Sequence, residues 1–246
     1  ACGLASSEGR ITFKYYFLFL LFMALNPKKE AAALEDFVQN IYWGENLSAE
    51  ESKKRLEEGI IEARQYEQHS FNGLLITDNG YFLTAKHCVD RDFSGTRIYL
   101  YDGTSYSIEK ICCWGKKDDV ALVKADIGGN CSAKRYRIYY EEEIRDVPFA
   151  LMARRDGSII MKHGFANDAP VSKVNVEARG EVSVTNDFIS DIPARSGDSG
   201  GIAVSSEGRL MGLTVMGTKE SNIAFAVKIT KALELITFYR QRLLAR

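Results

Sequence analysis

The sequence predicts an all-β fold, a barrel or a sandwich, with a helical extension before it and one helix after it. Twelve short apolar or alternating runs, separated by turn residues, follow one another as the strands of such folds do. Asp78-Asn79-Gly80 joins the first two runs and is typical of a hairpin turn, since Asn-Gly tolerates positive φ. Helical spacing of apolar residues returns over Thr230–Leu244. The runs span residues 71–77, 81–85, 96–101, 106–114, 120–124, 149–153, 158–161, 171–174, 181–185, 201–205, 210–216 and 223–227.

The composition is that of a globular protein. Of 246 residues, 46% are apolar and 26% are charged, which excludes wholesale disorder, collagen-like repeats and a chain that crosses a membrane many times. Lys and Arg (32) nearly balance Asp and Glu (33), so no basic excess indicates nucleic acid as a partner. Five cysteines are too few for a disulfide scaffold, and three histidines allow no zinc-finger spacing. We therefore expect neither a bound metal nor a cofactor.

Residues 1–27 contain an uninterrupted run of 11 apolar residues, Tyr15–Leu25. Arg10 and Lys14 precede it, and basic residues before a short apolar segment are typical of a signal peptide or a membrane anchor. We therefore expect a periplasmic, secreted or membrane-anchored protein that associates with a membrane through this run. A buried helix or strand in a cytoplasmic protein is the alternative.

Residues 28–69 are expected to form a helical extension of two helices. Ser48 and Glu51 match a capping box, in which each side chain accepts a hydrogen bond from the backbone N–H of the other residue. The helix that follows is expected to continue to the end of this extension. Its apolar face would consist of Leu56, Ile60, Ile61 and Ala63.

Three segments of the strand-rich region carry residues suited to chemistry. They contain His87, Asp119 and Ser199, within Leu-Thr-Ala-Lys-His-Cys-Val, Asp-Val-Ala-Leu-Val and Ser-Gly-Asp-Ser-Gly-Gly. A hydroxyl nucleophile needs an adjacent base to take its proton, and that base needs a partner that fixes its tautomer and stabilises its charged form. The three residues supply these parts in the order His, Asp, Ser. A core histidine, a surface aspartate and a turn serine are the alternative.

The glycines around Ser199 indicate a second part of such a site. Gly197 and Gly200 permit a tight turn with unusual backbone angles, which can aim N–H groups at one point. We expect the N–H groups of Gly197 and Ser199 to form an oxyanion hole, in which each donor typically contributes roughly 3–4 kcal/mol of transition-state stabilisation.

With these motifs the chain resembles the trypsin/chymotrypsin-fold serine proteases, and most of all their bacterial HtrA/Deg-type branch. In that branch Gly-Tyr-x-x-Thr precedes the histidine, as residues 80–84 do here. A Gly-x-x-x-Gly strand and then a Phe-Ala-hydrophobic strand follow the serine, as residues 208–214 and 225–227 do here. The resemblance covers about residues 70–240.

The resemblance implies a serine endopeptidase that hydrolyses protein or peptide substrates through an acyl-enzyme formed on Ser199. It also implies two six-stranded antiparallel β-barrels, chymotrypsin-like, with the active site between them. His87 and Asp119 would belong to the first barrel and Ser199 to the second. The expected bounds are residues 70–246 for the protease domain, about 70–135 for barrel one, about 140–228 for barrel two and 230–244 for the C-terminal helix.

Three positions depart from the family pattern. Trypsin-like enzymes pair the cysteine beside the histidine with one about sixteen residues upstream; no cysteine stands there in this chain, so we expect Cys88 to be free. The cysteine usual four residues before the serine is Arg195. No activation sequence is present, so Asp198 needs a partner other than a new N-terminus, or is solvated. HtrA-type chains usually carry Asn there and a PDZ domain afterwards, which this sequence is expected to lack.

The resemblance also places a specificity pocket beside Ser199. Pro193 stands where trypsin has the acidic residue that selects Lys or Arg, so we expect a small or medium apolar side chain before the scissile bond. Met216 and Gly217 would offer an edge strand to the extended backbone of a substrate. The walls of the pocket would be Pro193, Ala194, Arg195 and Ser196 on one side and Val215, Met216 and Gly217 on the other.

The sequence leaves one other class of function open. A protease-fold binding or chaperone-like module would keep the three residues but lack a competent cleft. An esterase is disfavoured, because its nucleophile elbow would place the histidine last in chain order. The oligomeric state is left open.

Overall fold

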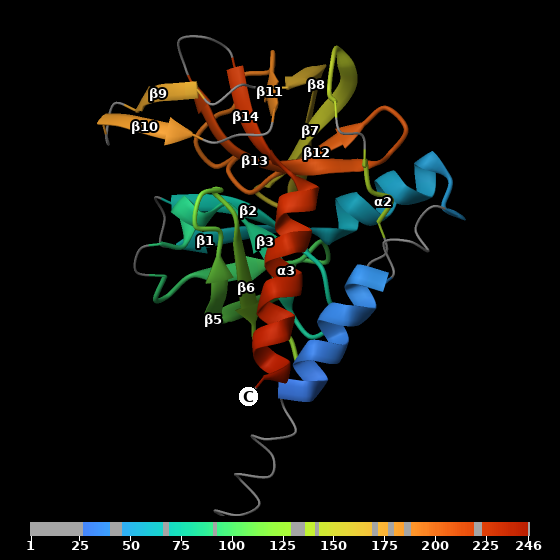
Figure 1. Ribbon diagram of the computed structural model, residues 1–246, viewed down its shortest axis with the longest axis vertical. Helices are drawn as coiled ribbons and strands as arrows, with labels where there is room; N and C mark the ends of the chain where they lie inside the picture. Colours follow the sequence, from blue (N-terminus) through green and yellow to red (C-terminus); the bar gives the residue numbers. More distant parts are fainter. Residues whose placement is uncertain are drawn as a thin grey trace, which may run out of the picture.

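The computed structural model consists of two β-barrels, one above the other, with helices along one side (Figure 1). It describes residues 27–39, 46–65, 69–90, 93–128, 136–140, 143–168, 172–176, 180–184, 188–218 and 223–245. The two-barrel fold predicted from the sequence is confirmed. The predicted signal or anchor run Tyr15–Leu25 lies outside the described residues, and no helix within them is long and apolar enough to span a membrane.

Barrel one is a closed antiparallel sheet with the strand order β1-β2-β3-β6-β5-β4. Pairing between β1 and β4, with Ala63 opposite Ile98, closes it. Alternate residues of its strands, such as Phe71 and Leu75, point into an apolar interior. Its strands are β1 (Ile60–Gln65), β2 (His69–Leu75), β3 (Tyr81–Thr84), β4 (Arg97–Tyr99), β5 (Ser105–Trp114) and β6 (Ala121–Ala125).

Helix α2 (Ala49–Gly59) begins as the sequence predicts. Ser48 Oγ accepts from the N–H of Glu51 at 3.2 Å, and Glu51 Oε2 accepts from the N–H of Ser48 at 3.1 Å, so the capping box is confirmed. The helix ends at Gly59, earlier than predicted. A Cβ at this position would lie 2.1 Å from the hydroxyl oxygen of Tyr136, so this turn of chain packs too closely for a side chain.

Ile60–Gln65 form β1 where the sequence predicts the continuation of a helix. Apolar residues at these positions fit helical spacing, but they fit equally a strand that is buried on both faces. Ile60 packs into the cluster between the barrels and Ile61 into the interior of barrel one, and β-branched residues favour such a strand. The helical extension predicted over residues 28–69 is therefore wrong in its last part, and barrel one begins before residue 70.

Barrel two is closed in the order β11-β14-β13-β12-β7-β8. The sequence predicts β9 (Ser172–Val176) and β10 (Gly180–Val184) as strands of this barrel, but among the described residues they pair with each other alone, in a separate two-stranded sheet. β11 is not among the predicted strands, because polar residues on both sides leave an apolar run of only Phe188 and Ile189. The barrel strands are β7 (Val147–Arg155), β8 (Ser158–Asp168), β11 (Phe188–Ser190), β12 (Ile202–Ser205), β13 (Leu210–Thr218) and β14 (Ile223–Lys228).

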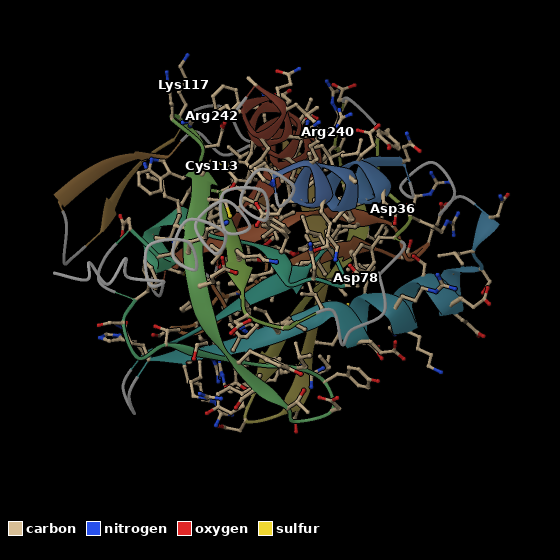
Figure 2. All side chains as sticks on the ribbon, turned by 90° about the horizontal axis from the view of Figure 1, so that it is seen from below. Asp36, Asp78, Cys113, Lys117, Arg240 and Arg242 are labelled. Atoms are coloured by element: carbon tan, nitrogen blue, oxygen red, sulfur yellow. The ribbon has the colours of Figure 1, made fainter. Side chains whose placement is uncertain are left out.

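Two helices cover the side of the barrels. α3 (Ile229–Leu244), which confirms the predicted C-terminal helix, follows β14 and runs down over barrel one (Figure 1). A helical segment, residues 27–39, lies beside α3 in both views (Figure 2). Glu35 of this segment pairs with Arg240 at 2.6 Å, and its Phe37 is buried in the same apolar cluster as α3. That cluster also fills the seam between the two barrels.

Leu56→Ala tests whether α2 belongs to the folded core. Leu56 is 0% exposed and packs in the cluster between the barrels, so the change leaves a cavity and should cost about 2–5 kcal/mol of unfolding free energy. Lys54→Ala, at an exposed position of the same helix, should change the unfolding free energy by about 0.5 kcal/mol or less. Denaturant unfolding measures the effect of each variant. Effects that are equally small for Leu56→Ala and Lys54→Ala would show that α2 is not part of the folded core.

Candidate active site

Two neighbouring strands of barrel one bring His87 and Asp119 together. β3 and β6 are antiparallel, with Thr84 opposite Ala121, so the end of β3 and the start of β6 meet at one edge. His87 follows β3 in a single 3-10 turn, Lys86–Cys88, and Asp119 precedes β6. The N–H of His87 donates to Asp119 Oδ1 at 2.8 Å, which fixes the histidine backbone against the carboxylate.

Ser199 comes from barrel two, in the turn before β12. His87 Nδ1 donates to Asp119 Oδ2 at 2.6 Å, and His87 Nε2 lies 3.1 Å from Ser199 Oγ. Ser199 Oγ also lies 3.3 Å from the carbonyl oxygen of Val215, where β13 carries a bulge. The structure thus joins the three residues predicted from the sequence into one hydrogen-bonded triad across the two barrels.

The carboxylate of Asp119 sets the protonation of His87. Burial of the ring lowers the pKa of His87, but the hydrogen bonds to Asp119 and Cys88 and the charge on Asp119 outweigh burial and raise it above its ordinary value. The same hydrogen bond puts the proton of the neutral ring on Nδ1, which leaves Nε2 as an acceptor facing Ser199. The ring is therefore oriented as a base toward the hydroxyl.

The four residues before Ser199 form a tight turn. The N–H of Asp198 donates to the carbonyl of Arg195 at 3.0 Å. Gly197 has φ +93°, whereas Ser196 does not have a positive φ, and this combination is a type II turn that glycine enters without strain. Arg155 Nη2 donates to the carbonyl of Ser196 at 3.3 Å, so the N–H at the other end of that trans peptide points away from Arg155.

Gly200 lets barrel one approach the turn closely. Its φ is +78°, and a Cβ here would lie 1.8 Å from the carbonyl oxygen of Asn72 in β2. Asn72 donates from its backbone N–H to Ser199 C=O at 2.7 Å and from Nδ2 to Gly197 C=O at 2.6 Å. No motif in the sequence marked Asn72, which is buried and holds the backbone on both sides of Asp198.

Asp198, whose partner the sequence left open, is 1% exposed and is not solvated. Arg155 Nη2 donates to its Oδ1 at 2.8 Å, and Lys162 Nζ donates to its Oδ2 at 2.7 Å. The backbone N–H of Arg195 also donates to Oδ2, at 2.8 Å. The sequence does not predict that Arg155 and Lys162 contact Asp198, because an isolated Arg and an isolated Lys on two strands form no motif.

The predicted specificity residues lie on two elements beside Ser199. Ala194 is buried, whereas Pro193 and Arg195 are exposed. The carbonyl of Pro193 accepts from Lys162 Nζ at 2.9 Å. The other predicted wall, Val215, Met216 and Gly217, belongs to β13, which pairs with β14.

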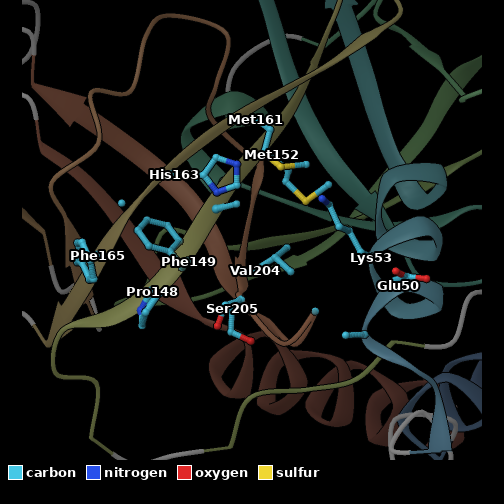
Figure 3. A pocket seen from close by; sticks show the side chains of 15 residues that line it. Glu50, Lys53, Pro148, Phe149, Met152, Met161, His163, Phe165, Val204 and Ser205 are labelled. Atoms are coloured by element: carbon cyan, nitrogen blue, oxygen red, sulfur yellow. The ribbon is translucent and has the colours of Figure 1, made fainter.

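A separate hollow of about 430 Å³ lies between α2 and barrel two (Figure 3). Its lining is mostly apolar and includes Phe149, Met152, Met161 and Phe165, with Lys53 of α2 at its side. None of the triad residues lines it, so His163 in this hollow is remote from the chemistry of Ser199.

The cysteines within the described ranges are all free. Cys88, predicted to lack a disulfide partner, lies with its Sγ 3.6 Å from His87 Nε2, and Cys112 and Cys113 are also unpaired thiols. Within the described part of the chain, no group of three or more His, Cys, Asp or Glu side chains could hold a metal ion.

The two barrels and the position of the triad between them define a chymotrypsin-like protease fold. The Trypsin family model matches residues 51–236, and the chain belongs to this family. Among solved structures it is similar to the serine endoprotease from Yersinia pestis, with a TM-score of 0.56 and 18% identity over 79% of this chain and 67% of that one. The curated proteins contain no match. At this identity the likeness shows the fold, and the HtrA/Deg-type branch stays a prediction.

Asp119→Asn should lower the pKa of His87, because it removes the charge that stabilises the imidazolium. In NMR titrations of the Ser199→Ala protein, the His87 ring signal should titrate at a pH above about 6.5, which is the ordinary pKa of a histidine side chain. The Asp119→Asn change should move this titration to lower pH. His87→Gln identifies the signal by its loss. A signal that titrates at the same pH with and without the charge would contradict the pairing.

Proposed function

We propose that this protein is a serine endopeptidase and that Ser199 is its nucleophile. The observation that carries the proposal is the placement of His87, with Nδ1 2.6 Å from Asp119 Oδ2 and Nε2 3.1 Å from Ser199 Oγ. His87 accepts the hydroxyl proton as Ser199 Oγ attacks the scissile carbonyl, and then gives that proton to the leaving amine. Asp119 keeps the ring oriented and stabilises its cationic form. Water hydrolyses the resulting acyl-enzyme by the same steps.

The N–H groups of Gly197 and Ser199 are proposed as the oxyanion hole. Neither donates a hydrogen bond to another of the described residues, so both are available to a ligand oxygen. The type II turn and its bond to Arg155 support this role, because they turn the N–H of Gly197 away from that side chain. Donors of this kind each contribute roughly 3–4 kcal/mol in the transition state.

Peptide or protein chains are the proposed substrates, with a small or medium apolar side chain before the scissile bond. Pro193 supplies no negative charge to the pocket. Near it, the carboxylate of Asp198 is paired with two cations, Arg155 and Lys162, so it is not available to attract a basic substrate side chain. Met216–Gly217 would pair with the extended substrate backbone.

The second candidate function, which the sequence leaves open, is a binding or chaperone-like module on the same fold. Such a protein has no need for a base within hydrogen-bond distance of a hydroxyl, or for a carboxylate on the far side of that base. The two distances in the triad therefore favour the enzyme.

Ser199→Ala should abolish both casein cleavage and labelling by a fluorophosphonate, because the attacking oxygen is lost. Loss of such a nucleophile lowers kcat by on the order of 10⁶-fold. Ser206→Ala, at an exposed turn, is the control and should keep full activity and labelling. Labelling that survives in Ser199→Ala would overturn the assignment, and a wild-type protein that binds casein without cleaving it would favour the binding module.

Substrate preference tests the pocket. Peptide p-nitroanilides with Ala or Val before the scissile bond should show kcat/KM at least about tenfold above those with Lys or Arg. Pro193→Asp should narrow this difference by supplying a negative charge. A wild-type preference for Lys or Arg would contradict the proposed specificity.

A further inference from the structure

Asp198 is a buried carboxylate at the centre of the turn that precedes Ser199. A buried charge is tolerated only where other charges and hydrogen-bond donors compensate it, and loss of a partner strongly disfavours the arrangement. Here the compensation comes from Arg155, Lys162 and the N–H of Arg195, at 2.7–2.8 Å. The position of Asp198 is therefore determined by where these two cations stand.

Both cations come from the β7–β8 hairpin, which pairs continuously from Val147 opposite Ala166 to Arg155 opposite Ser158. Each also holds a carbonyl of the turn region. Arg155 Nη2 donates to Ser196 C=O at 3.3 Å, and Lys162 Nζ donates to Pro193 C=O at 2.9 Å. A rigid hairpin of barrel two thus holds the loop at its start, at its central peptide and at the carboxylate.

The central peptide of this turn has two orientations that a glycine permits. In type II the carbonyl of Ser196 faces Arg155; in type I the peptide is turned over, and its carbonyl and N–H exchange sides. Turning it over would replace the N–H donor of Gly197 by the carbonyl of Ser196, an acceptor that repels a negatively charged oxygen. Without Arg155, no other residue that the structure describes donates a hydrogen bond to that carbonyl to favour the type II form.

We propose that Arg155 and Lys162 are positioning residues that hold the oxyanion turn in its donor-presenting form through Asp198. The inference rests on the proposed function. It assigns a role in turnover to two side chains whose hydrogen bonds go to Asp198 and to the turn backbone rather than to the triad. It also implies that the oxyanion donors are presented without a new N-terminus at Asp198.

The test compares Arg155→Met, Lys162→Met and the double variant with Lys228→Met. Lys228 is the matched control, because its side chain is 21% exposed, like that of Lys162, and pairs with Asp168 at 3.0 Å in the same barrel. Lys162→Arg is the conservative variant that keeps the charge. Measurements are kcat and KM with a peptide amide, the pH profile, and inhibition by a peptide boronic acid. The boron of this inhibitor becomes tetrahedral when it bonds to Ser199 Oγ, and one oxygen of the adduct then lies in the oxyanion hole.

The double variant should lose kcat by on the order of 10²-fold, the effect of one oxyanion donor, with little change in KM. Boronate affinity should fall in parallel, since a transition-state analogue needs the same donor. The limb of the pH profile that reports His87 should stay in place, because the triad is untouched. Lys228→Met and Lys162→Arg should retain kcat.

A double variant with wild-type kcat and boronate affinity would overturn the inference, and so would a rise in KM that accounts for the whole loss. If the double variant unfolds on heating below the assay temperature, Arg155→Met alone decides, because it leaves Lys162 on Asp198. Failure of the proposed function is recognised separately, by wild-type protein that neither cleaves the amide nor labels at Ser199. In that case the NMR signal of the Gly197 N–H still decides without a ligand: it should differ between wild type and the double variant, in which the peptide turns over, and should not differ between wild type and Lys228→Met.

Discussion

One buried amide, that of Asn72, connects the two halves of the site. All four of its polar groups are used: the backbone N–H and Nδ2 donate to Ser199 and Gly197, Oδ1 accepts from the N–H of Arg154 at 2.6 Å, and its carbonyl accepts from Thr84 Oγ1 at 2.6 Å. Each such group left unpaired would cost about 1–3 kcal/mol. Because the base lies in barrel one and the nucleophile in barrel two, their contact depends on this junction.

The same requirement for satisfied polar groups organises the rest of the seam. The guanidinium of Arg154 is buried in β7 and donates to carbonyls of Glu57, Ile60 and Gly157, so it ties barrel two to α2 and β1. A fully satisfied buried polar network specifies one arrangement, whereas the hydrophobic effect of the apolar cluster around it is non-directional. The apolar residues hold the barrels together, and the polar ones fix their register.

The triad was predictable because its residues carry chemistry and occur in a recognisable order. The strands were predictable from their runs, but their partners were not, and so β9 and β10 were assigned to a barrel they do not join. Ile60–Gln65 were misassigned because burial on both faces erases the alternation that marks a strand. Asn72, Arg155 and Lys162 have roles that exist only once distant strands meet, so no local pattern could have indicated them.

Neither barrel contains a complete site, and this division has a consequence for how the seam is built. Two separate proteins with such an interface would have to associate from solution, but here a covalent connection keeps them at an effective concentration on the order of millimolar. The seam can therefore carry hydrogen-bonded groups that favour alignment over tightness and still remain closed. The apolar cluster holds the barrels together, and the polar groups of the seam have only to align them.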